Sequence, residues 1–441
     1  MPPHTHAFHQ VDVFTPTIFA PITGRGGAVT VLRLSGPHAL EIAATLAGNL
    51  PKPRHAALRT LRDTDNQILD HALVTTFPGP ASFTGENCVE LSLHGGRAVL
   101  TAISHALIAA GARPAEPGEF SRRAFQNGKL NLLQAEATAD LIAAETQAQR
   151  RQALEGADFL QNACQTWRES LRRLMAQQEA LIDFPDEDLP PEVEHNLTQN
   201  IQTLLAEMQT ALTAAPRAKN LREGLEFVIL GPPNAGKSTL LNALAGADIA
   251  IVSETPGTTR DAVGTRIDLN GIPVNLTDTA GLRETTDPIE SEGINRAQSR
   301  AKNADLIIAV AAAPHPQFPH TPDGIEALHV ITKTDLFEAA PMGFLHVSAK
   351  TGAGLPTLLE TLTQIAIKRT DTTGIPPLAR PRQLACLRDS ATALTDALTT
   401  TEPELRGENL RTAATALGRL TGLIGVEEIL DAVFSSFCIG K

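Results

Sequence analysis

A glycine-rich segment, GPPNAGKST (231–239), has the residue types that could bind a phosphate group. It matches the pattern GxxxxGK[ST] and lies between an apolar run and a helical pattern, as a phosphate-binding loop requires. Gly231 and Gly236 let the backbone curl so that amide groups point at phosphate oxygens. Lys237 can reach the β- and γ-phosphates, and the Ser238 hydroxyl can bind Mg²⁺. The segment predicts a nucleoside triphosphate site.

Two later segments could sense the γ-phosphate. SETPGTTRD (253–261) contains Thr259, a natural second hydroxyl on Mg²⁺. An Asn-Gly pair at 270–271 predicts a hairpin, whose second strand delivers Asp278 to the site, where it can hold Mg²⁺ through water. Gly281 leaves room for a backbone N–H to meet the γ-phosphate. Two such switch segments are typical of a GTPase.

Base recognition is expected further along the chain. In VITKTDLF (330–337), Asp335 can accept both guanine N–H groups while Lys333 covers the ring. HVSAKTG (346–352) offers the backbone N–H of Ala349 to guanine O6. The order of these segments after the phosphate loop favours guanine as the base.

The usual NKxD pattern has an asparagine where this chain has Thr332. Threonine is shorter and has no amide to bridge the base and the phosphate loop. We therefore expect weaker guanine affinity, with selectivity kept by Asp335. The residues expected to contact GTP are Asn234, Ala235, Gly236, Lys237, Ser238, Thr239, Ser253, Thr258, Thr259, Asp278, Thr279, Ala280, Gly281, Thr332, Lys333, Asp335, Ser348, Ala349 and Lys350.

The group that activates water is not the glutamine found in Ras-like enzymes, because Leu282 follows the DTAG segment. The candidates are Glu290 and Glu292 in the second switch, or Arg260 and Arg283. Each of these residues could equally be a solvated charge on a loop.

The secondary-structure patterns that must position these residues change twice along the chain and so define three regions. Residues 1–127 mix β-like runs at 28–36 and 88–96 with a helical stretch near 98–110, which predicts a small α+β domain. Long helical patterns follow, in which apolar residues recur at intervals of three and four. They are Leu160, Cys164, Trp167, Leu171 and Leu174, and then Leu197, Ile201, Leu204, Met208 and Leu212.

Strands alternate with helices over 221–368, and a linker at 373–382 precedes further amphipathic helices. Apolar helix faces on both sides of the insertion need each other for burial. We therefore expect a multidomain chain: an N-terminal α+β domain (1–127), an all-α helical domain split in sequence (128–220 and 371–441), and an inserted α/β Ras-like P-loop G domain (221–370).

Composition excludes several classes. With 42% hydrophobic and 20% charged residues the chain of 441 residues reads as a globular protein, and its longest apolar run, LIIAVAAA (306–313), fits a buried strand rather than a membrane span. The first residues lack the basic flank and apolar stretch of a signal peptide. The 4 Cys have no paired spacing, so neither a zinc site nor a disulfide framework is indicated. A cytoplasmic location fits best.

The net charge of −12, with 1 Trp and 0 Tyr, argues against a dedicated nucleic-acid wrapper. Any contact with RNA must be local or shared with a partner.

The longest motifs resemble those of the tRNA-modifying GTPases called MnmE or TrmE, and the resemblance covers essentially the whole chain. It is carried by GRGGAVTVLRLSG (24–36), FPGPASFTGENCVELSLHGG (77–96), PGEFSRRAFQNGKLNLLQAEATADLI (117–142), the G-domain motifs and the terminal FCIGK. The N-terminal blocks and the terminal tetrapeptide are the most specific of these.

The resemblance implies an activity. Members of this family act with a flavoprotein, MnmG, to add an aminomethyl-type group to C5 of the wobble uridine in certain tRNAs, with a one-carbon unit from 5,10-methylene- or 5-formyl-tetrahydrofolate. Arg33, Glu90 and Lys129 match the positions that hold the folate, and Lys441 also approaches it. The N-terminal domain would then bind folate and form a homodimer.

The resemblance also implies K⁺-stimulated hydrolysis across a dimer. Asn234 matches the K⁺ ligand of the phosphate loop, and Ser253, Thr255 and Thr258 match the loop that closes over the ion. Glu290 aligns with the residue that positions the attacking water. Arg260 and Cys438 complete the catalytic candidates; Cys438 could act as a thiolate near the one-carbon chemistry, or be an inert residue that ends a helix.

Two other classes remain open. A ribosome-assembly or RNA-binding GTPase would have a similar G domain, although the net charge of −12 disfavours a basic RNA-binding module. A folate-dependent methyl or formyl transferase could use GTP only for regulation. The modified nucleosides of tRNA would separate these readings.

Overall fold

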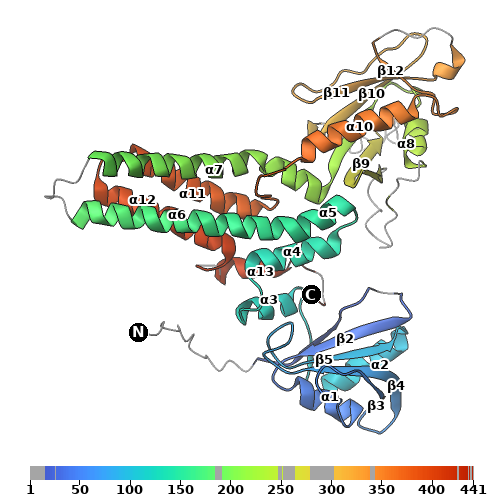
Figure 1. Ribbon diagram of the computed structural model, residues 1–441. Helices are drawn as coiled ribbons and strands as arrows, with labels where there is room; N and C mark the ends of the chain where they lie inside the picture. Colours follow the sequence, from blue (N-terminus) through green and yellow to red (C-terminus); the bar gives the residue numbers. More distant parts are fainter. Residues whose placement is uncertain are drawn as a thin grey trace, which may run out of the picture. The chain divides into compact units, whose positions relative to one another are not determined.

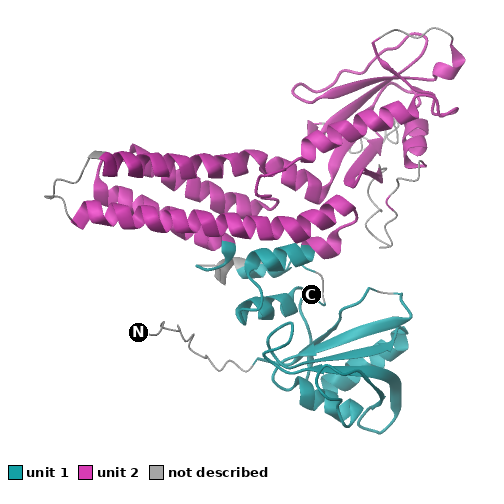
Figure 2. Cartoon of the chain, in the orientation of Figure 1, with its two compact units in different colours: residues 1–139, 421–441 teal, residues 140–420 magenta. Residues whose placement is uncertain are grey.

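The computed structural model describes residues 15–24, 26–183, 191–246, 251, 264–278, 302–337, 343–424, 427–435, 437 and 440. The chain divides into two compact units (Figure 2). Unit 1 comprises residues 1–139 and 421–441, and unit 2 comprises residues 140–420. These units cut across the four segments expected from the sequence, whose boundaries stay a prediction.

Unit 1 contains a six-stranded sheet in the order β3-β4-β5-β2-β1-β6. Neighbouring strands are antiparallel except β1 and β6, which are parallel. The strands are β1 (Ile18–Pro21), β2 (Val29–Ser35), β3 (Ala57–Arg62), β4 (Ile68–Phe77), β5 (Cys88–His94) and β6 (Arg113–Pro114). The strands predicted at 28–36 and 88–96 are confirmed as β2 and β5.

Along β2 and β5, successive side chains point alternately to the two faces of the sheet. Leu32 and Leu34 of β2 and Leu91 of β5 are buried in the core that the sheet shares with the helices α1 (Ala39–Ala47) and α2 (Arg97–Ala109) (Figure 1). Side chains of the intervening residues point to the opposite face. This alternation places Arg33 and Glu90 together on the face away from α1 and α2.

A second, smaller core in unit 1 joins residues from both ends of the sequence. The helices are α3 (Glu119–Gln126), α4 (Leu132–Ala143) and α13 (Glu427–Ser435). Phe434 of α13 packs against Phe125 and Phe437, with ring centroids 6.3 and 5.3 Å apart, and the same cluster includes Leu132. The last residues therefore belong to unit 1, whereas the sequence placed them with the second half of the helical domain.

Four long helices form a bundle in unit 2: α6 (Ala157–Asp183), α7 (Pro191–Glu223), α11 (Pro381–Thr399) and α12 (Pro403–Thr421) (Figure 1). The amide Nε2 of Gln178 donates to the carbonyl of Pro403 at 2.9 Å, and the Ser390 hydroxyl donates to the carbonyl of Ala413 at 3.0 Å. Helices from both sides of the insertion thus complete one bundle, as the sequence predicted. The predicted buried face of α6, from Leu160 to Leu174, is confirmed.

The inserted part of unit 2 is built on a second sheet, ordered β12-β11-β10-β7-β9-β8. All neighbours are parallel except β8 and β9. The strands are β7 (Leu225–Leu230), β8 (Gly264–Leu269), β9 (Ile272–Asp278), β10 (Leu306–Ala312), β11 (Ala327–Thr332) and β12 (Leu345–His346), and the helices are α8 (Lys237–Ala245) and α10 (Leu355–Thr370). This is the α/β G-domain architecture that the sequence predicted.

The β8–β9 hairpin turns at Asn270 and Gly271, both with positive φ (55° and 87°), so the predicted Asn-Gly hairpin is confirmed. The turn touches the short helix α5 (Gln147–Arg151), where the N–H of Ala148 donates to the carbonyl of Gly271 at 3.3 Å. Arg266 of β8 also forms an ion pair with Glu145 at 2.9 Å. The hairpin therefore packs against the helical part of the same unit.

None of the helices in the described part of the chain is long and apolar enough to cross a membrane.

Candidate functional site

The phosphate loop lies between β7 and α8. Gly236 has φ of 82°, a backbone conformation that favours glycine, and α8 begins directly after it at Lys237. At Gly231, a Cβ atom would collide with the carbonyl oxygen of Val310, so only glycine fits. The loop thus places the free amide groups of a helix N-terminus where an anion would bind.

Lys237 occupies the centre of this loop. Its Nζ donates to the carbonyls of Gly231 and Pro232, at 2.8 and 2.9 Å. Burial lowers the pKa of Lys237, and the nearby Asp278 carboxylate partly opposes that effect. The two carbonyls hold the ammonium group across the loop, in reach of a phosphate oxygen that would replace them.

Oxygen atoms suited to Mg²⁺ lie beside the lysine. The Ser238 hydroxyl donates to Oδ2 of Asp278 at 2.5 Å. Because β9 runs parallel to β7, its last residue, Asp278, reaches the same edge of the sheet as the loop after β7. A hydroxyl and a carboxylate at this distance are hard donors of the kind that Mg²⁺ prefers, so the residues fit the ion.

Thr332 ends β11 with its side chain pointing to the phosphate loop. Its hydroxyl donates to the carbonyl of Ala235 at 2.5 Å and lies 3.3 Å from the carbonyl of Ala311. Only 2% of the residue is exposed. Although threonine has no amide group, its hydroxyl reaches the phosphate loop, because β11 brings the backbone close. The weaker guanine affinity stays a prediction.

The two segments expected to read the base meet at the ends of β11 and β12. The hydroxyl of Ser348, which is fully buried, donates to Oδ1 of Asp335 at 2.7 Å. This hydrogen bond, ahead of weaker contributions that include the charge of Lys350, lowers the pKa of Asp335. Asp335 is thus held as an oriented carboxylate, which suits an acceptor for two guanine N–H groups.

In unit 1, Arg33 and Glu90 are direct partners across β2 and β5. Nε and Nη2 of Arg33 both donate to Oε1 of Glu90, at 3.0 and 2.7 Å. Among the described residues none donates to Oε2 of Glu90, which leaves that oxygen for a donor on a ligand. Both side chains are largely buried, with 16% and 25% of their areas exposed.

Two aromatic rings flank the guanidinium group of Arg33. The group lies 4.9 Å from the ring centroid of Phe83 and 5.7 Å from that of Phe120. Such cation–π contacts fix the guanidinium plane. Sequence reasoning missed both rings, because Phe83 lies in a loop and Phe120 in α3, and no spacing links them to Arg33.

The third folate candidate, Lys129, lies beside the 78–87 loop that joins β4 to β5. Gly85 in that loop has φ of 81°, and a Cβ there would be 3.3 Å from Cε of Lys129 and 3.0 Å from Cβ of Asn127. The loop that carries Phe83 therefore also contacts Lys129.

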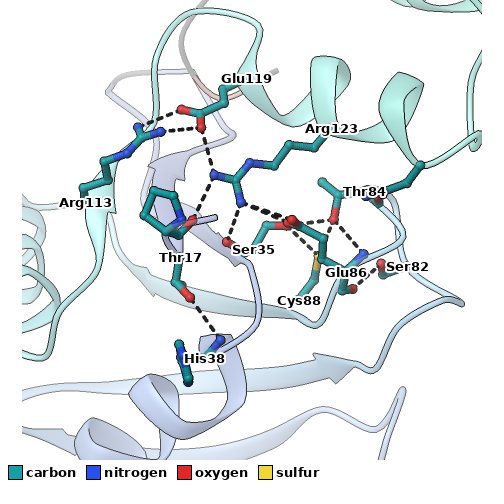
Figure 3. A network of polar contacts seen from close by, with 12 residues as sticks. Thr17, Ser35, His38, Ser82, Thr84, Glu86, Cys88, Arg113, Glu119 and Arg123 are labelled. Carbon is teal, nitrogen blue, oxygen red and sulfur yellow. Dashed lines mark hydrogen bonds and ion pairs between the residues drawn. The ribbon is translucent and has the colours of Figure 1, made fainter. Parts of the chain in front are cut away.

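Beneath this loop lies a network of polar side chains, drawn in Figure 3. Arg123 is its centre, with 6% of its side chain exposed, and it forms ion pairs with Glu119 at 2.9 Å and Glu86 at 3.1 Å. Arg113 binds the same Glu119 at 2.6 Å. Burial alone would raise the pKa of Glu119, but hydrogen bonds from Arg113, the backbone of Glu116 and Arg123 together hold it below its ordinary value.

Several expected site residues lie outside the described residues. They are Ser253, Thr255, Thr258, Thr259, Arg260, Thr279, Ala280, Gly281, Glu290, Cys438 and Lys441. Within the part that is described, no group of three or more His, Cys, Asp or Glu side chains could hold a metal ion. The three cysteines among those residues, Cys88, Cys164 and Cys386, are buried thiols.

Family models match two parts of the chain. The "GTP-binding protein TrmE N-terminus" model matches residues 17–129, and the "MnmE helical domain" model matches residues 132–438. The second match alone spans more than half of the chain.

Curated relatives match nearly the full length. "tRNA modification GTPase MnmE" of Acidiphilium cryptum is 56% identical over 96% of this chain and 98% of its own length. The protein of the same name from Gluconacetobacter diazotrophicus is 50% identical, with the same shares covered. Among solved structures, the G domain of the T. maritima FeoB iron transporter matches 33% of this chain and 99% of its own, at 23% identity and a TM-score of 0.23, too low to add support.

Proposed function

Since the chain belongs to the MnmE/TrmE family of tRNA modification GTPases, we propose that its GTP hydrolysis drives the addition of an aminomethyl or carboxymethylaminomethyl group to C5 of the wobble uridine in certain tRNAs. The one-carbon unit would come from 5,10-methylene- or 5-formyl-tetrahydrofolate. The observation that carries the folate part is the Arg33–Glu90 pair, whose second carboxylate oxygen accepts from no described residue.

The nucleotide half of the mechanism follows from the loop geometry. The ammonium group of Lys237 exchanges its two carbonyl partners for the β- and γ-phosphates. Ser238 and Asp278 would hold Mg²⁺, which neutralises charge on the phosphates when bound. Asp335, oriented by Ser348, accepts from the base. Water activation is assigned to Glu290, with Arg260 as a second candidate from the first switch.

Three further parts of the cycle rest on the resemblance of the motifs. Asn234, at φ of 60° in the phosphate loop, would bind K⁺ together with Ser253, Thr255 and Thr258. Pairing of two G domains would then complete the site in place of an arginine finger. The N-terminal units would form the constitutive homodimer.

Recognition of the folate would depend on the charge and shape of the site in unit 1. A pterin ring presents adjacent N–H donors, which suit a carboxylate such as Glu90, and its glutamate tail suits cations such as Lys129 and Lys441. Arg33 holds the Glu90 carboxylate in place, while Phe83 and Phe120 keep Arg33 from turning away. Cys438 would supply a thiolate close to the one-carbon unit.

The partner for the uridine chemistry would be the flavoprotein MnmG, with tRNA bound jointly in the cytoplasm. Joint binding agrees with the net charge of −12, which provides little attraction for phosphate by itself.

Mass spectrometry of wobble uridines tests this function, in tRNA from cells that lack the chain and from cells in which it is restored. Loss and recovery of the C5-modified uridine is the expected result. Unchanged nucleosides would place a ribosome-assembly GTPase first, and a change confined to methyl or formyl groups elsewhere would favour the transferase.

Two variants extend the restoration experiment. Restoration with Cys438→Ser should give normal GTP hydrolysis without modified uridine, and full modification would return the thiol to a passive role. Restoration with Glu290→Ala should fail through a lower kcat for GTP with unchanged GTP affinity; an equal loss of affinity would assign Glu290 to binding or folding.

A further inference from the structure

The 78–87 loop touches the proposed folate site at two points. Phe83 lies against the guanidinium group of Arg33, with its ring centroid 4.9 Å away. The backbone at Gly85 runs beside the side chain of Lys129, since a Cβ atom at Gly85 would lie 3.3 Å from Cε of Lys129. The conformation of this one loop therefore sets the environment of two cations that come from different parts of the unit.

The inner side of the loop is tied to β2 by hydroxyl groups. The Ser35 hydroxyl lies 2.7 Å from that of Thr84 and donates to Oε2 of Glu86 at 2.6 Å. Ser82 donates to the carbonyl of Glu86 at 2.5 Å, and Asn127 donates to the carbonyl of Thr84 at 2.7 Å. Arg54 also donates to the carbonyl of Ala81 at 2.5 Å, and Glu86 is the residue of the loop whose side chain binds Arg123.

Arg123 is the group that Glu86 binds (Figure 3). One guanidinium nitrogen, Nη1, donates to both oxygens of Glu86, at 3.3 and 3.1 Å, and the other, Nη2, donates to Glu119 and to the carbonyl of Pro16, each at 2.9 Å. A planar guanidinium group can donate hydrogen bonds to all of these acceptors at once, whereas a lysine ammonium group at the same position cannot.

The charges in this network are balanced, and Arg113 is its most exposed member, with 40% of its side chain exposed. Two guanidinium groups, those of Arg113 and Arg123, face two carboxylates, those of Glu86 and Glu119. Arg113 contacts only Glu119 of the two carboxylates. Without Arg123, Glu86 would keep no cation and would be drawn toward water, and the loop would move with it.

From this geometry we propose that Arg123 is a positioning residue for the folate site: through Glu86 it holds the 78–87 loop, and through the loop it sets Phe83 against Arg33 and Gly85 against Lys129. The inference rests on the proposed folate function and deepens it. Arg123 itself is buried beneath the loop and has no role in touching the ligand.

The test compares Arg123→Lys with Asp70→Asn in the full-length protein. Asp70 is the control because it is a buried charged side chain of the same unit that binds His94 and forms no hydrogen bond or ion pair with the 78–87 loop. Three properties are measured: amide hydrogen exchange in residues 78–87, affinity for 5-formyl-tetrahydrofolate by calorimetry, and kcat and KM for GTP.

Arg123→Lys is expected to speed exchange selectively in the loop and to weaken 5-formyl-tetrahydrofolate binding about tenfold, with GTP kinetics unchanged. Asp70→Asn should show neither the faster loop exchange nor the weaker binding. Wild-type loop exchange or wild-type affinity in Arg123→Lys would overturn the proposal, as would an equal loss of affinity in Asp70→Asn.

Failure of the folate function itself has a different signature. A wild-type protein that binds no 5-formyl-tetrahydrofolate would overturn that function, and with it the part of the proposal that concerns a ligand. Loop exchange would then still decide whether Arg123 holds the 78–87 loop.

Discussion

A single hydroxyl group links the base-reading end of the nucleotide site to the phosphate loop. Thr332 donates to the carbonyl of Ala235 at 2.5 Å in a fully packed environment. The link that an asparagine amide makes in the usual pattern is therefore made here by a shorter side chain. It couples the position of Lys333 and Asp335 to that of the loop.

Thr332→Val, which keeps the shape and removes the hydroxyl, should raise the Kd for GTP about fivefold to a hundredfold, because a buried carbonyl left unpaired costs ~1–3 kcal/mol. Isothermal titration with GTP and GDP measures the change. Thr332→Ser, which keeps the hydroxyl, is the control and should bind nearly as well as the wild type. Equal affinity in Thr332→Val and the wild type would contradict the link.

Low pH should reduce the stability of unit 1 through protonation of Glu119. Its folded pKa lies below its ordinary value because of Arg113 and Arg123, so its contribution to stability is complete above about pH 4.3 and is lost as the pH falls through the folded pKa. The difference in unfolding free energy between the wild type and Glu119→Gln should therefore be constant near pH 7 and shrink below about pH 4. Urea titrations followed by hydrogen exchange in unit 1 measure it; a pH-independent difference would refute the assignment.

At this scale the sequence indicated the residues that the structure brings together around the phosphate loop, but not the residues that surround Arg33 and Glu90. Lys237, Ser238 and Asp335 could be assigned because the chemistry of a phosphate loop and of guanine fixes both residue type and order. Phe83, Glu86 and Arg123 carry no such pattern. They meet only through the register of β2 and β5 and the path of one loop, which are tertiary properties.

Among the elements, the long helices were the most predictable from sequence. A spacing of three and four placed Leu160, Cys164, Trp167, Leu171 and Leu174 on one face of α6, and all five are buried. The π-helical turn at 152–156 was not predictable, since no residue pattern distinguishes it from an α-helix. The packing of α13 against α3 and α4 was also missed, because an amphipathic helix does not indicate which apolar surface it covers.

Leu171→Ala should destabilise the bundle by ~2–5 kcal/mol, because Leu171 is fully buried in α6 and its truncation leaves a cavity. Trp167 is the 1 Trp of the chain and lies one turn away on the same face, so its fluorescence reports unfolding of this bundle alone. Leu154→Ala, at a position that is 47% exposed, is the control and should shift the midpoint little. Equal midpoints of unfolding for the two variants would show that this face of α6 does not contribute to the core of the bundle.

On the scale of the whole molecule, one chain combines a nucleotide site in unit 2 with the Arg33–Glu90 pair in unit 1. The hairpin β8–β9 is one of the described elements that link the nucleotide site to the helical part of unit 2, because β9 ends at Asp278 and the turn packs on Ala148. Sequence patterns predicted both the insertion and its hairpin. They could not predict that contact, which depends on the tertiary packing of α5.

GTP hydrolysis should be severalfold faster in KCl than in NaCl at equal ionic strength, since Asn234 and the 253–258 segment match a K⁺ site that acts when two G domains pair. Initial rates over a range of protein concentrations measure both the ion preference and the dependence on pairing. Asn234→Ala should abolish the preference while GTP binding remains. Equal rates in both salts would remove the K⁺ proposal.

The closing of the small core of unit 1 by α13 has a consequence for biosynthesis. Ribosomes make residues 427–437 only after the whole of unit 2 has been translated, yet Phe434 and Phe437 cover Leu132 from the first part of the chain. Unit 1 therefore stays incomplete until residues 427–437 have been made, and a nascent chain stopped at residue 424 should be cut by protease near α4 at a rate well above that of the longer chain. Equal resistance would show that the earlier residues complete unit 1 alone. On this view, the folding of unit 1 depends on the synthesis of a helix that the ribosome makes after unit 2.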